Sequence, residues 1–377
     1  MDLSKKEIGG RIRNFRWRSG LTQAELANQM GFNSKQIISQ IEKGDREVKV
    51  FELVQLSQLL SIELDDLLRT EKPQKAPAIL WRDSPVSDKK KKEAEFIKHY
   101  NNYSLLEEMS GIKGSSQFPQ KRVDPEHLSF GVARSLANDI RREFNLGDRP
   151  ASVLEKTLED RFGVKIWYME MEKGSAASTI GPFGPAILMN SKEAPWRRNY
   201  NFGHELFHLI TWDSLPPSLI SKKPELWEDL ERKANAFASS LLLPSDPVSV
   251  EFGKYVKNKK IAYSDLIEIA RFFDVSTGAL LYRLVNMKCI PQAAADAVLN
   301  DESFREKDKS TMAPHWWQPP GLPERFVRIA FVAFQKGKLS KAKLADLLNS
   351  SLIDLTDTLQ EYGFSDDEGF STEVPTT

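Results

Sequence analysis

The stretch from Asn201 to Ile210 constrains this chain most, because it places two histidines four residues apart in an apolar segment. His204, Glu205 and His208 form the pattern His-Glu-x-x-His. On an α-helix such positions leave the same face one turn apart, so both imidazoles could bind one metal ion. Glu205 would then face the attacking water and act as general base. The pattern predicts a buried helix that carries metal-dependent hydrolysis.

The alternative interpretation is that the two histidines match this pattern by chance. The chain has only five histidines. With ordinary composition, a chance match somewhere in the chain is expected at roughly the half-per-cent level. We therefore favour the metal interpretation.

Composition bounds the class of protein. The 377 residues are enough for two or three domains. The 53 basic and 53 acidic residues cancel, although the first 50 residues carry ten Lys/Arg against six Asp/Glu, a balance of +4. The single cysteine, Cys289, excludes an intramolecular disulfide, and neither a signal-peptide core nor an apolar run of membrane-spanning length is present. We expect a cytoplasmic protein with no membrane partner.

The N-terminal 70 residues have the pattern of five short helices. Thr22 and Glu25 form a capping-box pattern, Gly31 marks a tight turn, and a second helix begins at Ser34 and stops at Gly44. Two short helices joined by a glycine turn indicate a helix-turn-helix. The segments Gly20–Gln23, Leu26–Ala27 and Ile38–Arg46 resemble the Xre family of repressors, which is related to the phage lambda repressor and Cro.

This resemblance implies that residues 34–42 form a recognition helix in the major groove of operator DNA. The side chains free to reach base edges would be Asn33, Ser34, Lys35, Gln36 and Ser39, and an amide at Gln36 suits adenine. The candidate phosphate contacts are Arg16, Gln23 and Arg46. A helix-turn-helix used only for dimer packing is the alternative, and a homodimer is expected because dimers read paired half-sites.

A second long helix is expected at residues 226–243, and it offers a third metal ligand. Glu231 and Asn235 lie one turn apart on it, so both could lie beside the histidines. A carboxylate would complete three ligands and leave a fourth position for water, while Asn235 would support a ligating side chain by a hydrogen bond. Other acidic residues near the site leave the choice open on residue type alone: Glu225, Glu228, Asp229 and, outside the helix, Asp213.

Together the two motifs resemble the ImmA/IrrE family of metallopeptidases, over roughly residues 125–250. The resemblance rests on His204–His208 and on Glu231 followed by Ala234, Asn235, Phe237, Ala238 and Leu241–Pro244. It implies a zincin-like peptidase in which His204, His208 and Glu231 hold Zn²⁺, with Mn²⁺ as the other candidate, and Glu205 is the base. Phe207 stands where the family often has glycine, which would narrow the space beside the metal.

The expected fold class is mainly α with a small β-sheet (α+β). We expect a helix-turn-helix domain at 1–70, a linker at 71–90, a metallopeptidase domain at 91–250 and a helix-turn-helix-like module at 251–300. A second linker at 301–322, a C-terminal helical module at 323–363 and a disordered acidic tail at 364–377 would follow. In zinc peptidases an extended substrate adds to the sheet edge beside the metal helix, so Pro185–Met189 is expected near the cleft. The lysines of Asp88–Lys92 could touch phosphate, but a solvated helix start is the favoured interpretation.

The leading functional hypothesis is a DNA-binding transcriptional regulator with a metal-dependent endopeptidase domain. Its substrate would be a repressor or antitoxin-type protein in a stress or mobile-element response, as the resemblance implies. The alternative is a non-enzymatic regulator or antitoxin whose metal domain is a sensor, and a self-cleaving switch is a third class. An intact Glu205 favours hydrolysis, because a structural metal site has no use for a base. The oxyanion stabiliser is open between Tyr200, His315 and the metal.

Overall fold

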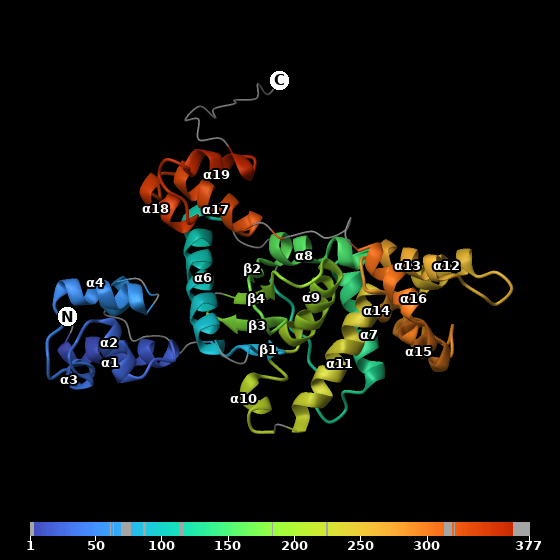
Figure 1. Ribbon diagram of the computed structural model, residues 1–377, viewed down its shortest axis with the longest axis horizontal. Coiled ribbons are helices and arrows are strands. Elements are labelled where there is room, and N and C mark those ends of the chain that lie inside the picture. Colours follow the sequence, from blue (N-terminus) through green and yellow to red (C-terminus); the bar gives the residue numbers. More distant parts are fainter. Residues whose placement is uncertain are drawn as a thin grey trace, which may run out of the picture.

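The structure, a computed structural model, describes residues 4–60, 62, 64–68, 77–85, 88–112, 117–182, 184–223, 225–312, 319 and 321–364. These residues form an N-terminal helical domain beside a larger body built on one four-stranded sheet (Figure 1). The expected α+β class, mainly helical with a small sheet, is confirmed. His315 and residues 365–377 of the expected acidic tail lie outside the described residues.

The N-terminal domain contains the five expected helices. They are α1 Lys5–Arg18, α2 Gln23–Gln29, α3 Lys35–Lys43, α4 Val50–Leu59 and α5 Leu64–Leu68. The hydroxyl of Thr22 accepts from the amide of Glu25, whose carboxylate accepts from the amide of Thr22 at 2.7 Å, so the capping box is confirmed. Gly44 ends α3 at φ 80°, and a Cβ there would lie 2.7 Å from Lys6 Cα. Only glycine fits this left-handed turn without displacing backbone.

The sheet has the strand order β1-β3-β4-β2. Its strands are β1 Leu80–Arg82, β2 Lys165–Met169, β3 Ala176–Gly181 and β4 Gly184–Asn190. β3 pairs antiparallel with both β1 and β4, whereas β2 pairs parallel with β4. Alternate residues enter two different cores, as the period of two requires, with Ile187 and Met189 on one face and Leu188 on the other.

Helices cover both faces of the sheet (Figure 1). The face bearing Ile187 shares its core with α7 Phe130–Glu143, α9 Pro195–Ile210 and α11 Glu225–Leu242. The opposite face packs against α6 Lys89–Ser110 and α17 Glu324–Gln335. The remaining helices are η1 Pro150–Ser152, α8 Leu154–Lys156, the π-helical turn η2 Thr157–Arg161, α10 Pro217–Ile220, α12 Ser245–Tyr255, α13 Tyr263–Phe272, α14 Thr277–Asn286, α15 Gln292–Asn300, α16 Glu302–Ser310, α18 Lys341–Leu347 and α19 Leu355–Glu361. None of the helices described here is long and apolar enough to cross a bilayer.

The expected first linker needs correction. Residues 80–82 form the strand β1, which pairs with Ala176–Ser178, and α6 already begins at Lys89. Leu80 and Trp81 enter opposite cores, which explains why this stretch is ordered into the sheet. The segment between the N-terminal domain and α6 therefore contributes an edge strand to the central body.

The boundaries expected near the C-terminus also need correction. Helices α13 and α14 share the core of α9, and the buried Arg283 donates to the carbonyl of Leu243 at 2.8 Å. Phe304 of α16, placed in the expected second linker, is buried in that same core. The module at 323–363 shares the core of α6, where Arg325 lies 2.7 Å from the carboxylate of Glu107. Because short helices cannot bury an apolar face alone, these segments pack onto the central body.

The strand order corrects the expectation that Pro185–Met189 lies at a sheet edge near the peptide cleft. β4 is an interior strand with partners on both sides, so its backbone groups are not free to pair with a peptide. The edge beyond β3 is formed by β1. Arg82 of β1 donates from Nη1 to Oδ1 of Asn201 on α9 at 2.6 Å, which ties this edge to the helix that bears the histidines.

Candidate functional site

Helix α9 carries the His-Glu-x-x-His pattern through the core, as expected. Pro195 occupies its first turn, and every residue from Asn201 to Ile210 is buried. Gly203 lets α11 approach closely, because a Cβ there would lie only 3.2 Å from the Cβ of Ala238. Gly203 was not among the residues predicted from the sequence, although a glycine inside a helix often marks a close contact.

The structure brings together the three expected ligands, His204, His208 and Glu231. The two Nε2 atoms lie 3.2 Å apart, and Glu231 Oε1 lies 3.3 Å from that of His204 and 3.0 Å from that of His208. Ligands of a tetrahedral Zn²⁺ at about 2.0–2.1 Å lie about 3.3 Å from one another. The spacing and the donor set therefore fit one divalent ion.

Glu205 supplies a second test of fit. Its side chain is completely buried, and neither carboxylate oxygen has a hydrogen-bond partner among the described residues. A buried carboxylate without a partner is costly, so such a group usually serves a ligand, ion or water. Burial is the main influence on the pKa of His204 and lowers it, while the Glu205 charge acts the other way, so the Glu205 carboxylate lies near the ligand cluster. The residues present fit a catalytic metal centre.

The electrostatics of the cluster suit a cation. Burial alone would raise the pKa of Glu231, but hydrogen bonds from His204 and His208 hold that pKa well below its usual range. Burial also lowers the pKa of His204. Glu231 is therefore ionised, as a metal ligand must be, and metal binding at the two Nε2 atoms would displace any proton held there.

Neighbouring side chains hold the ligands in place. The Nδ1 atom of His204 lies 3.1 Å from Oδ1 of Asn235, which leaves Nε2 directed at the cluster. The hydroxyl of Tyr200 donates to the backbone carbonyl of Asn235 at 2.8 Å, and burial raises the pKa of Tyr200 to about 12. The ring of His208 stacks on Trp227 at 5.4 Å. Trp227 was not predicted as a site residue, because no spacing pattern in the sequence relates it to the histidines.

The other acidic candidates do not join the cluster. Glu225, Glu228 and Asp213 are exposed, and Asp229 pairs with Lys233 and Arg232. Phe207 points into the core against Phe237, with ring centroids 5.6 Å apart. Phe207 also meets the ring of His208 edge-on. The choice of Glu231 among the nearby acids is the one that the geometry favours.

Asn235→Ala is expected to weaken metal binding about 10–100-fold, because loss of a supporting hydrogen bond frees the ligating ring. Metal affinity measured by chelator competition checks this. Asn235→Asp keeps an acceptor for Nδ1 of His204 and should retain affinity. Equal affinity of the alanine variant and the wild type would show that Asn235 does not position His204.

The expected recognition surface is largely exposed. Asn33, Lys35 and Gln36 are exposed, while Ser34 and Ser39 are half-buried. Ser34 caps α3, and its hydroxyl donates to Oε1 of Gln36. Gln40 is also exposed and lies one turn beyond Gln36 on the same helical face. The spacing of four residues from Gln36 could have identified Gln40 from the sequence as a further candidate for contact with base edges.

The expectation that Arg16 contacts phosphate needs correction. Arg16 is only 5% exposed, and its guanidinium forms two contacts with the buried carboxylate of Glu42, one from Nη2 at 3.1 Å. Its Nη1 donates to the carbonyl of Leu21. Gln23 also donates to Glu42 at 2.8 Å, so these side chains join α1, α2 and α3. Arg46 is half-buried and pairs with Glu52 at 2.7 Å, so its contact with phosphate stays a prediction.

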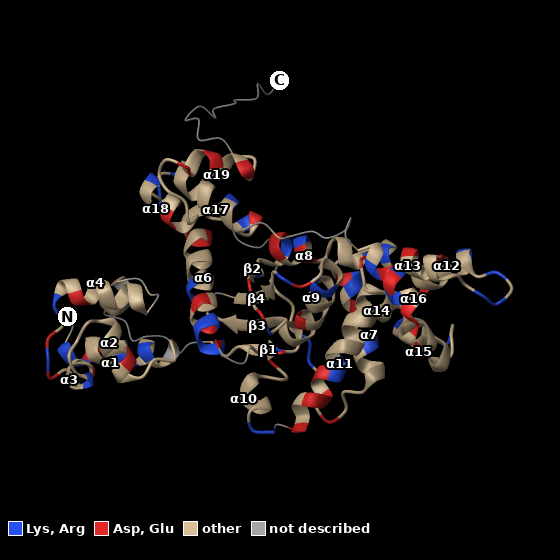
Figure 2. Cartoon of the chain, in the orientation of Figure 1, with Lys and Arg blue, Asp and Glu red and all other residues tan. Residues whose placement is uncertain are grey.

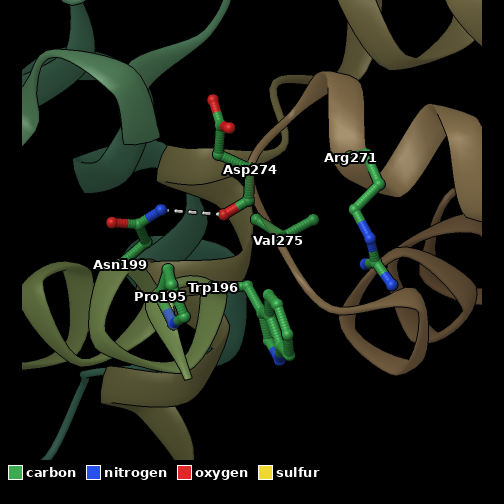
Figure 3. Close-up of a pocket in the computed structure, with 6 residues that line it drawn as sticks. All are labelled: Pro195, Trp196, Asn199, Arg271, Asp274 and Val275. Carbon is green, nitrogen blue, oxygen red and sulfur yellow. Dashed lines mark hydrogen bonds between the residues drawn. The ribbon is translucent and has the colours of Figure 1, made fainter. Parts of the chain in front are cut away.

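A small pocket lies at the other end of α9 (Figure 3). Pro195, Trp196 and Asn199 line it from α9, Arg271 lines it from α13, and Asp274 and Val275 line it from the turn after α13. Asn199 donates from Nδ2 to the backbone carbonyl of Asp274 at 2.9 Å, and the guanidinium of Arg271 lies 5.0 Å from the ring of Trp196. The pocket contains none of the candidate ligands, and its contacts fasten α13 to the first turns of α9.

Comparison with known proteins agrees with both motifs. Residues 159–285 match the family model of the IrrE N-terminal-like domain, a peptidase family, and this range contains all the candidate ligands. Residues 12–67 match the helix-turn-helix family model, which spans the whole expected recognition surface. No curated protein matches the chain. The chain therefore joins an Xre-like helix-turn-helix domain to an IrrE/ImmA-like domain of the peptidase family.

Proposed function

We propose that the chain is a transcriptional regulator whose IrrE-like domain is a zinc-dependent endopeptidase. The observation that carries this proposal is the completely buried carboxylate of Glu205, which has no hydrogen-bond partner among the described residues. It lies near three ligand atoms that are all within 4.8 Å of one another. A site that only held a metal would not need this acceptor. Its presence favours hydrolysis.

The ligands would be Nε2 of His204, Nε2 of His208 and a carboxylate oxygen of Glu231. Zn²⁺ bound there would polarise the scissile carbonyl and make water acidic enough to lose a proton near neutral pH. A carboxylate oxygen of Glu205 accepts that proton and later returns it to the leaving amine. The complete burial of Glu205 would keep bulk water away from this proton transfer.

Tyr200 serves the site indirectly in this proposal. Its hydroxyl already donates to the carbonyl of Asn235, which in turn positions His204. A group committed to a backbone carbonyl is not free to stabilise an oxyanion. We therefore assign Tyr200 to ligand positioning.

The helix-turn-helix would bind an operator as a homodimer, with α3 in the major groove. The expected substrate is a repressor or antitoxin-type protein bound near that operator, because attachment to DNA raises its effective concentration at the peptidase. A direct test incubates the purified chain and Zn²⁺ with the repressor encoded beside its gene. Metal-dependent appearance of two fragments supports the proposal, and an intact repressor under all metal conditions contradicts it.

Gln36→Ala is expected to lower affinity for the cognate operator by about 1–3 kcal/mol, the value of one good bidentate base contact. Affinity for random DNA should stay nearly unchanged, because phosphate contacts dominate there. Titration of both duplexes by fluorescence anisotropy measures this. Gln29→Ala, an exposed glutamine at the end of α2, is the control. Equal losses on operator and random DNA would contradict base reading by Gln36.

One observation favours a second candidate, a regulator whose metal domain is a sensor. β1 covers the edge of β3 next to α9, where an extended substrate would add to the sheet. A peptide would have to bind elsewhere or displace Leu80–Arg82. In the sensor, metal would alter DNA affinity and no protein would be cleaved, so Glu205→Gln would leave the metal-dependent change in DNA affinity intact.

A further inference from the structure

The first turn of α6 carries four consecutive lysines, Lys89–Lys92, and it lies against the N-terminal domain. A Cβ placed on Gly20 would lie 3.3 Å from Cδ of Lys90, so the Lys90 side chain covers the turn between α1 and α2. Figure 2 shows this basic end of α6 beside the N-terminal helices. The lysines thus belong to the central body but lie next to the DNA-binding domain.

The positive charges of Lys89–Lys92 are unfavourable at the N-terminus of α6. The start of a helix carries a positive partial charge and favours acidic side chains, yet α6 has none in its first turn. Asp88, which precedes the helix, makes no side-chain cap hydrogen bond. Lys89 and Lys92 reach Glu93 and Glu95 only at 4.0 Å.

Lys90 and Lys91 are both exposed. Neither has an ion-pair partner in the part of the chain that the structure describes. Four cations crowded at a helix start, two of them paired with acids only at 4.0 Å, suit an anionic partner outside the chain.

The position of this lysine turn specifies that partner. Gly20 lies two residues before Thr22, the N-cap of α2. In helix-turn-helix proteins the first helix of the motif crosses the DNA backbone. Lys90 therefore lies beside the start of the helix that would run along that backbone.

We propose that Lys90 and Lys91 bind phosphates of the DNA that flanks the segment read by α3. This inference rests on the proposed DNA-binding function. DNA would then contact both domains at once. Since α6 packs directly on the sheet of the peptidase-family domain, bound DNA would fix the orientation of that domain relative to the operator.

Salt dependence tests this proposal with the full-length chain and a random-sequence duplex of about 40 base pairs. Each lysine that neutralises a phosphate contributes about 0.9 to the slope of log K against log salt concentration. Lys90→Gln/Lys91→Gln should therefore reduce the slope by about 1.8. Between about 50 and about 200 mM salt the wild type should lose about tenfold more affinity than the variant.

The matched control is Lys257→Gln/Lys259→Gln, which removes two exposed lysines from the loop between α12 and α13, at the far end of the molecule (Figure 2). It should retain the wild-type slope, and neither variant should melt below the wild type, because the glutamines remove cations from an unfavourable helix start. A wild-type slope in Lys90→Gln/Lys91→Gln overturns this inference alone and leaves an acidic protein surface as the partner. A wild-type chain that binds no duplex overturns the DNA-binding function together with it.

Discussion

Replacing Glu205 by glutamine is expected to lower the rate of substrate cleavage about 10²–10⁴-fold, the usual contribution of a positioned general base. Glutamine has the same shape but cannot accept the proton from water. The cost of burying an unpartnered carboxylate disappears in the variant, so the protein should be at least as stable as the wild type. Cleavage rates under single-turnover conditions, with metal content measured in parallel, check this prediction.

The matched control for this substitution is Glu228→Gln, which changes an exposed glutamate on α11. It should cleave at the wild-type rate. The Glu205→Gln chain should still carry its metal, because Glu205 is not among the three clustered ligands. Equal cleavage by Glu205→Gln and the wild type would remove Glu205 from the mechanism.

Glu231→Ala is expected to have the largest effect on metal binding. It removes one of the three ligands and leaves only the Nε2 atoms of His204 and His208, which lie 3.2 Å apart. The loss of affinity should exceed the roughly 10–100-fold that the loss of a supporting hydrogen bond costs. Metal affinity by chelator competition and cleavage rate at saturating Zn²⁺ are the two readouts, and both should fall.

Glu228→Ala is the informative comparison, because Glu228 lies on the same helix and was an open alternative on the sequence. It is exposed and does not join the ligand cluster. Its metal affinity should equal that of the wild type. If Glu231→Ala retains full affinity while Glu228→Ala loses it, the assignment of the third ligand is wrong.

Local patterns in the sequence predicted the local structure well. The capping box at Thr22, the glycine stop at Gly44 and the helix through His204 and His208 depend on residues within a few positions of one another. The third ligand comes from a different helix, so residue type alone left several acids open. In the structure Glu231 is the acid that lies near both histidines, and Gly203 allows α11 to approach α9 closely.

Predictions failed where tertiary packing overrode a local pattern. Arg16 was expected at phosphate because it is basic, yet it lies one turn after the buried Ile12 and meets Glu42 from another helix. Residues 80–82 and 302–310 were expected in linkers because prolines and charges surround them. Leu80, Trp81 and Phe304 are nevertheless buried, and their burial against distant segments could not be read from short-range patterns.

The most direct test of the metal centre is native mass spectrometry of the wild-type chain together with elemental analysis. We expect one Zn²⁺ or Mn²⁺ per chain, held by His204, His208 and Glu231. A wild-type chain that stays metal-free after incubation with either ion, yet is folded and binds DNA, would contradict it.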